Sequence, residues 1–305
     1  MEEIKNNPKE KDSSSWMKVK SKYILKYIFE HLKESKLLNI IRYNKKLKKV
    51  ADKNINDYIN EYLKIVIEII PIENKYGTFI NYTKRTKSYL HIYFNDKEEE
   101  IKRNIINKDD KVSKIKIIID NKVKTLSGLF KRCKCIKIIN FIKFNRTDID
   151  DMRYMFYQCS KLIEINFIYF NTDNVQKMIS MFHGCSSLKE LDLSEFNTEN
   201  VIDMMSMFDN CSSLKELNLS NFNTNNVTNM RLMFDNCSSL KELNLSNFNT
   251  NNVIFMNHMF SNCSSLKELN VSNFNTNNVK YMNSMFYNCS SLKELNLSNF
   301  NTNNV

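Results

Sequence analysis

The stretch CSSLKELNLSNFNTNNVTNMRLMFDN, residues Cys211–Asn236, decides the fold because its pattern returns every 26 residues. Cysteines mark this period, at Cys133, Cys159, Cys185, Cys211, Cys237, Cys263 and Cys289. Only Cys135 lies outside the series. A unit this short cannot bury its own apolar side chains, so the period predicts repeats that stack on one another.

Each repeat has two halves with different apolar spacing. In the first half Leu217 and Leu219 alternate with polar residues, which predicts a short strand with one buried face. The apolar residues of the second half follow one face of a helix, at Val227, Met230, Met233, Phe234 and Cys237. The sequence therefore predicts an α/β fold over residues 112–305: a leucine-rich-repeat-like solenoid with one short parallel strand and one short helix per repeat.

The cysteines have two interpretations, as metal ligands or as core residues. The chain has no Cys-x-x-Cys pair, and each repeated cysteine lies at the core-facing end of a predicted helix. Cysteine is a small apolar residue that is readily buried. The core interpretation is favoured, the repeated methionines are interpreted in the same way, and no metal or cofactor is expected.

The repeat resembles a known family. Its pattern is Leu-x-x-Leu-x-Leu-Ser-x-Phe-x-Thr-x-x-Val-x-x-Met-x-x-Met-Phe-x-x-Cys, and it is most regular from Ser186 onward. This pattern is similar to that of the BspA-like leucine-rich-repeat proteins of bacteria and protists, over about residues 123–305. The resemblance implies a leucine-rich-repeat-like solenoid and an adhesion or protein-binding role, commonly at cell surfaces.

The N-terminal part has a different pattern. Residues 1–20 are predicted to be a disordered basic and polar tail, and residues 21–111 a mainly helical, then α+β, domain. Three apolar stripes predict short helices, the last of which ends before Pro71. Strands are expected at residues 89–94 and 115–119, the second of them capping the repeats.

Residues Ser21–Leu47 weakly resemble an F-box, through the run Ile-Leu-x-x-Ile-Phe-x-x-Leu and a second apolar helix. The usual opening Leu-Pro is replaced by Ser21-Lys22. An F-box followed by leucine-rich repeats implies a substrate receptor of a ubiquitin ligase. A generic helical cap or interaction domain is the alternative for this segment.

No enzyme is expected. The three glycines lie far apart, so no glycine-rich loop is available to hold a phosphate. The four histidines show no ligand spacing, and no Ser/His/Asp or Cys/His constellation stands out. The acidic clusters Asp150–Asp151 and Glu98–Glu100 are interpreted as a helix start and a solvated face.

Two surfaces are candidates for binding a protein partner of unknown identity. The first is the polar side of the predicted strands: Glu190, Asp192, Ser194, Glu216, Asn218, Ser220, Glu242, Asn244, Ser246, Glu268, Asn270, Ser272, Glu294, Asn296 and Ser298. The second is an aromatic set, favoured in interfaces, at Phe255, Tyr281 and Tyr287. Nucleic acid is not expected, because the net charge of +11 comes mainly from residues 1–122 and the repeats are near neutral.

The sequence also bears on location and assembly. The first twenty residues hold no signal-like apolar run, and no stretch approaches about 18 apolar residues, so no membrane span is expected. A cytoplasmic location is predicted, with the cell surface as the alternative that the family resemblance implies. The chain stops at Val305, where an eighth helix would begin, which predicts a truncated chain or end-to-end self-association through an uncapped end.

Overall fold

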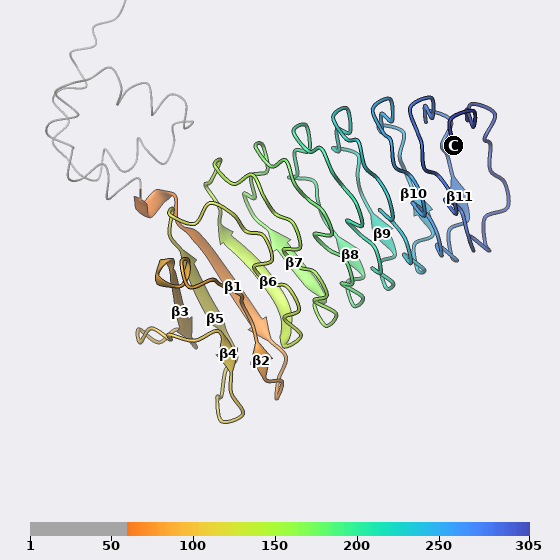
Figure 1. Cartoon of the computed structure of the whole chain (residues 1–305). Helices are drawn as coiled ribbons and strands as arrows, with labels where there is room; N and C mark the ends of the chain where they lie inside the picture. Colours follow the sequence, from red (N-terminus) through yellow and green to blue (C-terminus); the bar gives the residue numbers. More distant parts are fainter. Residues whose placement is uncertain (1–59) are drawn as a thin grey trace, which may run out of the picture. The chain divides into compact units, whose positions relative to one another are not determined.

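The computed structural model describes residues 60–305, and a compact unit runs from Leu63 to Val305. Helical structure in this part is limited to residues 60–62 and the 3-10 helix η2, Lys87–Tyr89. The strands (Figure 1) are β1 Ile65–Pro71, β2 Gly77–Thr78, β3 Leu90–Phe94, β4 Ile105–Ile106, β5 Ile115–Ile119, β6 Ile136–Lys143, β7 Glu164–Phe167, β8 Glu190–Leu191, β9 Glu216–Leu217, β10 Glu242–Leu243 and β11 Glu268–Leu269.

Five strands form one sheet in the order β3-β5-β1-β6-β7. Strand β1 is antiparallel to β5 and β6, whereas β6 and β7 are parallel. Ile65, Ile67 and Ile69 are fully buried and alternate with partly exposed residues, the pattern of a strand with one covered face. Strands β3 and β5 confirm the strands predicted near residues 89–94 and 115–119.

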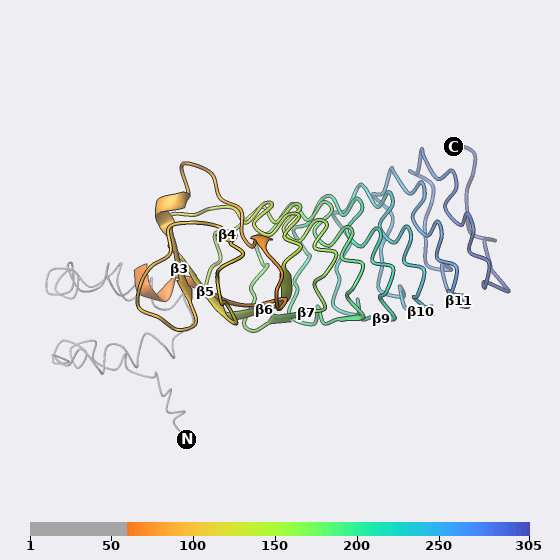
Figure 2. The same cartoon turned by 90° about the horizontal axis from the view of Figure 1, so that it is seen from below.

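From β6 onward, each repeat pairs in parallel with the next at an offset of 26 residues. On one side Glu190 lies opposite Glu216 in β8 and β9, and Glu242 lies opposite Glu268 in β10 and β11. On another side single bridges join successive repeats, such as Asn229 to Phe255. We call residues 123–305 the repeat stack; its turns follow one another in Figures 1 and 2.

The helix predicted in the second half of each repeat is wrong. Alternate backbone N–H groups donate to the next repeat instead of to the residue four positions back: Met230 to Phe255 O at 2.9 Å, and Phe234 to Met259 O at 2.9 Å. Leu232 and Asn236 also have φ of 57°, a left-handed conformation that interrupts a helix. The spacing of three arises from consecutive turns, not from helical periodicity.

The predicted fold class needs a wider correction. The described residues form short strands in several small sheets, with almost no helix, so the α/β leucine-rich-repeat-like solenoid is wrong. The mainly helical N-terminal domain is wrong over residues 65–111, which contain β1 to β4. Val66, assigned to the third predicted helix, belongs to β1, because its isoleucine-rich run alternates with period two. The predicted tail and the first two helices lie outside the described residues.

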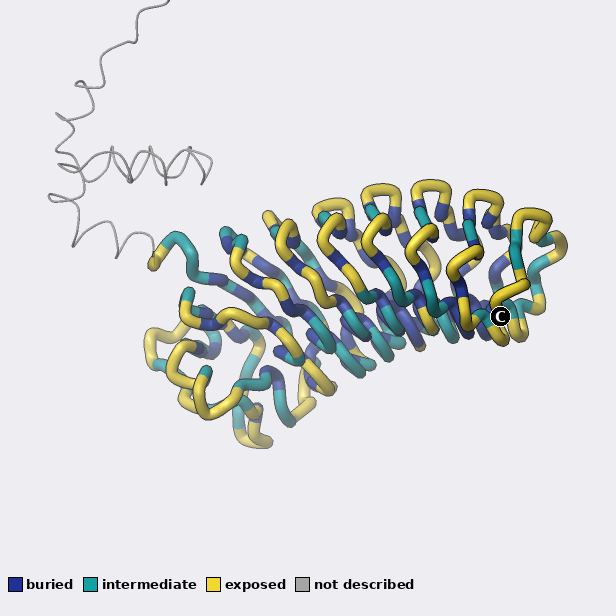
Figure 3. The backbone as a smooth tube through the Cα atoms, turned by 45° about the horizontal axis from the view of Figure 1, so that its top comes forward, coloured by how far each residue is buried: buried dark blue, intermediate teal, exposed yellow. Residues whose placement is uncertain are grey.

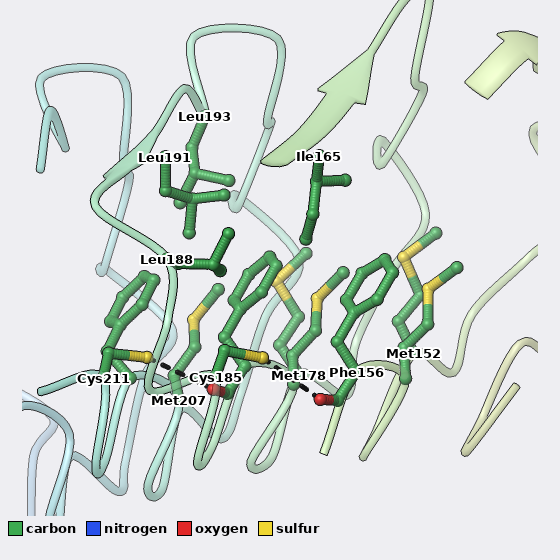
Figure 4. Packing of buried hydrophobic residues seen from close by; sticks show 14 of the residues in the cluster. Met152, Phe156, Ile165, Met178, Cys185, Leu188, Leu191, Leu193, Met207 and Cys211 are labelled. Carbon is green, nitrogen blue, oxygen red and sulfur yellow. Dashed lines mark hydrogen bonds between the residues drawn. The ribbon is translucent and has the colours of Figure 1, made fainter. Parts of the chain in front are cut away.

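The core consists of columns of identical residues. Phe182, Phe208, Phe234 and Phe260 stack with ring centroids 5.6–5.7 Å apart and nearly parallel planes. Buried residues line the inside of each turn, while exposed residues occupy the bends (Figure 3). Equivalent side chains of successive repeats lie side by side (Figure 4). Since each column repeats one residue type, each repeat fills the space left by its neighbour with a copy of itself.

Candidate interaction surfaces

The strand side of the repeat stack forms the first candidate surface, which we call the strand face. In each repeat Glu216, Asn218 and Ser220, or their equivalents, are exposed, while Leu217 and Leu219 are buried between them. Every residue predicted for this surface is exposed: Glu190, Asp192, Ser194, Glu216, Asn218, Ser220, Glu242, Asn244, Ser246, Glu268, Asn270, Ser272, Glu294, Asn296 and Ser298. The parallel register brings these residues together as rows along the stack.

The asparagine row also has a local structural task. Asn218 Oδ1 accepts a hydrogen bond from the backbone N–H of Ser220 at 3.0 Å, and Asn244 accepts one from Ser246 at 3.0 Å. Asp192 does the same for Ser194 at 2.9 Å. Asparagine and aspartate favour such turns two residues ahead. These side-chain oxygens therefore hold the bend, which leaves the glutamate row as the chemically free part of the predicted set.

A second charged row was missed by sequence analysis. The residues that precede each glutamate are exposed lysines: Lys189, Lys215, Lys241, Lys267 and Lys293. The backbone N–H of Lys215 donates to Lys189 O at 2.9 Å, and that of Lys267 to Lys241 O at 3.0 Å, so these lysines are in register. Their constant place before each glutamate was the available signal, and the high lysine content of the whole chain obscured it.

The aromatic set is only partly brought together. Phe255 and Tyr281 stack with ring centroids 5.0 Å apart and an interplanar angle of 4°. Tyr281 is 51% exposed and Tyr287 is 65% exposed, while Phe255 is half-buried. Tyr287 lies in another column, six positions further along the repeat, and shares no ring contact with the other two within the described chain. The structure thus supports one stacked pair and a separate tyrosine.

The column that contains Tyr287 has a different composition in each repeat. At its start the Lys131 ammonium lies 5.2 Å from the centre of the Tyr157 ring, which stacks on His183 with centroids 4.6 Å apart. His183 Nδ1 then lies 2.9 Å from a carboxylate oxygen of Asp209. These contacts link repeats by cation–π, ring-stacking and hydrogen-bonding interactions. Reading variable positions at intervals of 26 would have identified this column.

The repeated cysteines lie in the core. Each thiol donates to the carbonyl oxygen of a phenylalanine in the preceding repeat, as Cys185 does to Phe156 and Cys211 to Phe182, both at 3.2 Å (Figure 4). Burial raises the pKa of the Cys211 thiol to about 12, which keeps it in the unreactive thiol form at neutral pH. Within residues 60–305 no three His, Cys, Asp or Glu side chains are grouped to hold a metal ion.

The fold and these surfaces define a class: repeat proteins in which short strands and turns stack in parallel at intervals of 26 residues. The chain matches the model of the family described as "Mycoplasma protein of unknown function, DUF285" over residues 124–241 and 212–305. It belongs to this family. No curated protein and no solved structure matches it. In the part of the chain that the structure describes, no helix has the length and apolar character needed to cross a membrane.

Proposed function

We propose that this protein is a non-enzymatic protein-interaction module that binds its partner through the strand face. The observation that carries the proposal is the pair of exposed charged rows. Glutamates lie directly opposite one another in successive repeats, as Glu190 does to Glu216, although like charges in this position are destabilising. No ion pair among the described residues involves either row. A partner that carries charges at a matching interval relieves this repulsion.

The regular register supports the same proposal. A surface that repeats the same groups at each strand spacing of about 4.8 Å suits an extended or repetitive partner better than a compact ligand. The resemblance to the BspA-like proteins, for which protein binding is implied, agrees with this function. The substrate-receptor and adhesin alternatives stay predictions, and the F-box-like segment Ser21–Leu47 lies outside the described residues. Location also stays a prediction.

The test is a quantitative pull-down from the cells that make the protein. The tagged full chain is compared with a triple variant, Glu216→Ala, Glu242→Ala and Glu268→Ala, and with a control, Asp150→Ala and Glu199→Ala, which removes exposed acidic groups away from the strand face. We expect the triple variant to lose at least about tenfold of the co-purifying protein, because binding to an array falls steeply when several contacts are lost together. The control should retain it. Equal recovery with all three chains would rule out the strand face.

A further inference from the structure

Two rows of opposite charge lie side by side along the strand face. The lysine row consists of Lys189, Lys215, Lys241, Lys267 and Lys293, and the glutamate row of Glu190, Glu216, Glu242, Glu268 and Glu294. All ten residues are exposed. Each lysine is adjacent in sequence to a glutamate, so the rows run parallel along the stack. Each row gathers like charges, and neither row neutralises the other through an ion pair among the described residues.

We propose that the occupant of this face is a second copy of the chain. A second copy carries both rows at the same interval, so it can pair every repeat in register. No adjustment of spacing is needed between the two surfaces. The proposal rests on the proposed function, since it names the partner of the same face.

The order of the two rows fixes the symmetry. A two-fold axis that runs parallel to the stack, midway between the rows, places each lysine row opposite the partner's glutamate row. Lys215 then faces the second copy's residue at position 216, and Glu216 faces the second copy's residue at position 215. An axis along the strands instead places lysine on lysine and glutamate on glutamate. The paired stacks therefore run in the same direction, as an isologous dimer.

The dimensions of the face predict a weak and salt-sensitive complex. Five repeats at about 4.8 Å and about five extended residues across each strand segment give roughly 400 Å² per copy. This is about half the area that a standard stable interface buries on each partner. Charge pairing must then supply much of the attraction, and salt screens exposed charges strongly at high ionic strength. We expect dimers at about 20 mM salt and monomers at about 500 mM, where screening is strong.

Charge reversal tests the pairing by sedimentation velocity of the purified full chain. The acidic variant carries Lys215→Glu, Lys241→Glu and Lys267→Glu. The basic variant carries Glu216→Lys, Glu242→Lys and Glu268→Lys. Each variant alone should be monomeric at low salt, since both of its rows have one sign over the central repeats. An equimolar mixture should form a dimer again, with an affinity at least about tenfold above that of the wild type, because every facing pair is then opposite in sign.

A matched control changes net charge equally away from the face. The variant with Lys122→Glu, Arg231→Glu and Lys280→Glu replaces three exposed cations and should remain dimeric at low salt. Circular dichroism checks that every variant folds, and the salt dependence of the wild type tests the proposal without substitution. A wild-type monomer at low salt overturns the self-pairing, as does a dimer that survives both reversals. Binding to other proteins is judged separately by the pull-down.

Discussion

Side-chain amides join successive repeats in the bends that follow the strands. Asn247 Nδ2 lies within hydrogen-bonding distance of three carbonyl oxygens of the preceding repeat: Leu219 at 2.9 Å, Ser220 at 3.3 Å and Phe222 at 2.6 Å. Asn273 meets Leu245, Ser246 and Phe248 in the same way. An amide nitrogen is a pure donor in such a site, so this position requires asparagine specifically and not merely a polar residue.

Replacing the amide by a carboxylate tests this requirement. Asn247→Asp removes the donor and points negative charge at three carbonyl oxygens, so we expect the free energy of unfolding to fall by about 1–3 kcal/mol. Urea unfolding followed by circular dichroism measures the change. Asn283→Asp is the matched control, since the Asn283 side chain is exposed and makes no hydrogen bond within the described residues. Equal effects at both positions would contradict the structural role of Asn247.

The cysteine column makes stability depend on alkaline pH. Burial raises the pKa of the Cys211 thiol from about 9 to about 12. Below pH 9 both states hold the proton, whereas between pH 9 and 12 the unfolded chain releases it and the folded chain does not. Stability is therefore complete below pH 9 and falls as pH rises towards 12, by about 1.4 kcal/mol per pH unit for each such thiol.

Cys211→Ala isolates one contribution to this fall. The variant starts less stable at pH 8, because a buried group is lost, but its free energy of unfolding should decrease less steeply between pH 9 and 10.5. Urea titrations at four pH values measure both slopes. Lysines and tyrosines titrate equally in the two chains, so they cancel in the comparison. Parallel slopes would show that the thiol does not stay protonated in the folded chain.

At the scale of elements, the turn segment of each repeat depends on two left-handed residues. Leu232 and Asn236 have φ of 57°, and the same two columns contain Gly128 at 66° and Gly184 at 72°. Glycine adopts this conformation without steric cost, and asparagine tolerates it. Leucine has neither advantage, so Leu232 holds a strained position that the hydrogen bonds to the next repeat maintain.

Two substitutions at Leu232 distinguish this turn from a helix. In a helix, isoleucine is better tolerated than glycine by about 0.5 kcal/mol. At a left-handed position the order reverses, because a β-branched side chain clashes with the backbone. We expect Leu232→Gly to be more stable than Leu232→Ile by about 1–2 kcal/mol, as measured by thermal or urea unfolding. The opposite order would restore the predicted helix.

The strands and the turns differ in how far sequence could predict them. Alternation at Leu217 and Leu219 identified the exposed strand face, because burial on one side of a strand produces period two directly. The spacing from Val227 to Cys237 suggested a helix, because turns of three residues place apolar groups at nearly helical intervals. Hydrogen bonds to the neighbouring repeat decide between the two, and they join residues 26 positions apart in sequence. Gly128 and Gly184 were the only local hints.

The candidate surfaces show a similar division. Exposure of the glutamates followed from the strand pattern, but their arrangement in rows depends on the parallel register between repeats. The lysine row was missed because lysine is abundant throughout the chain, so its regular position carried little weight. The column from Lys131 to Asp209 was missed for another reason. It contains a different residue in each repeat, and only stacking makes those residues neighbours.

At the scale of the whole molecule, each repeat contacts mainly the repeats before and after it. In such arrays stability is approximately a sum over units and their nearest-neighbour contacts. The phenylalanine column shows this coupling, since Phe208 stacks on Phe182 at 5.7 Å and on Phe234 at 5.6 Å. Damage at one repeat should therefore spread to its neighbours and weaken with distance.

Phe208→Ala tests how far such damage extends. Loss of a buried phenylalanine costs about 3–5 kcal/mol, and hydrogen exchange with mass spectrometry locates the effect. We expect faster exchange over about one repeat on each side, while the sheet of β1, β3 and β5 keeps its protection. Ile202→Ala, at a side chain 48% exposed, serves as the control. A uniform loss of protection in Phe208→Ala would mean that the unit unfolds as one cooperative block.

The register of the repeat stack also determines which changes of length the protein tolerates. Deleting Cys211–Asn236 places Phe182 and Phe234 side by side, and each finds the kind of neighbour it had before. Duplicating the same segment supplies another phenylalanine, another thiol and another asparagine amide to partners of the same type. A deletion of 25 residues instead shifts every later side chain by one place and turns leucines outward. Genetic gain or loss of whole units is thus neutral for packing, which makes the number of repeats a quantity that recombination can change in one step.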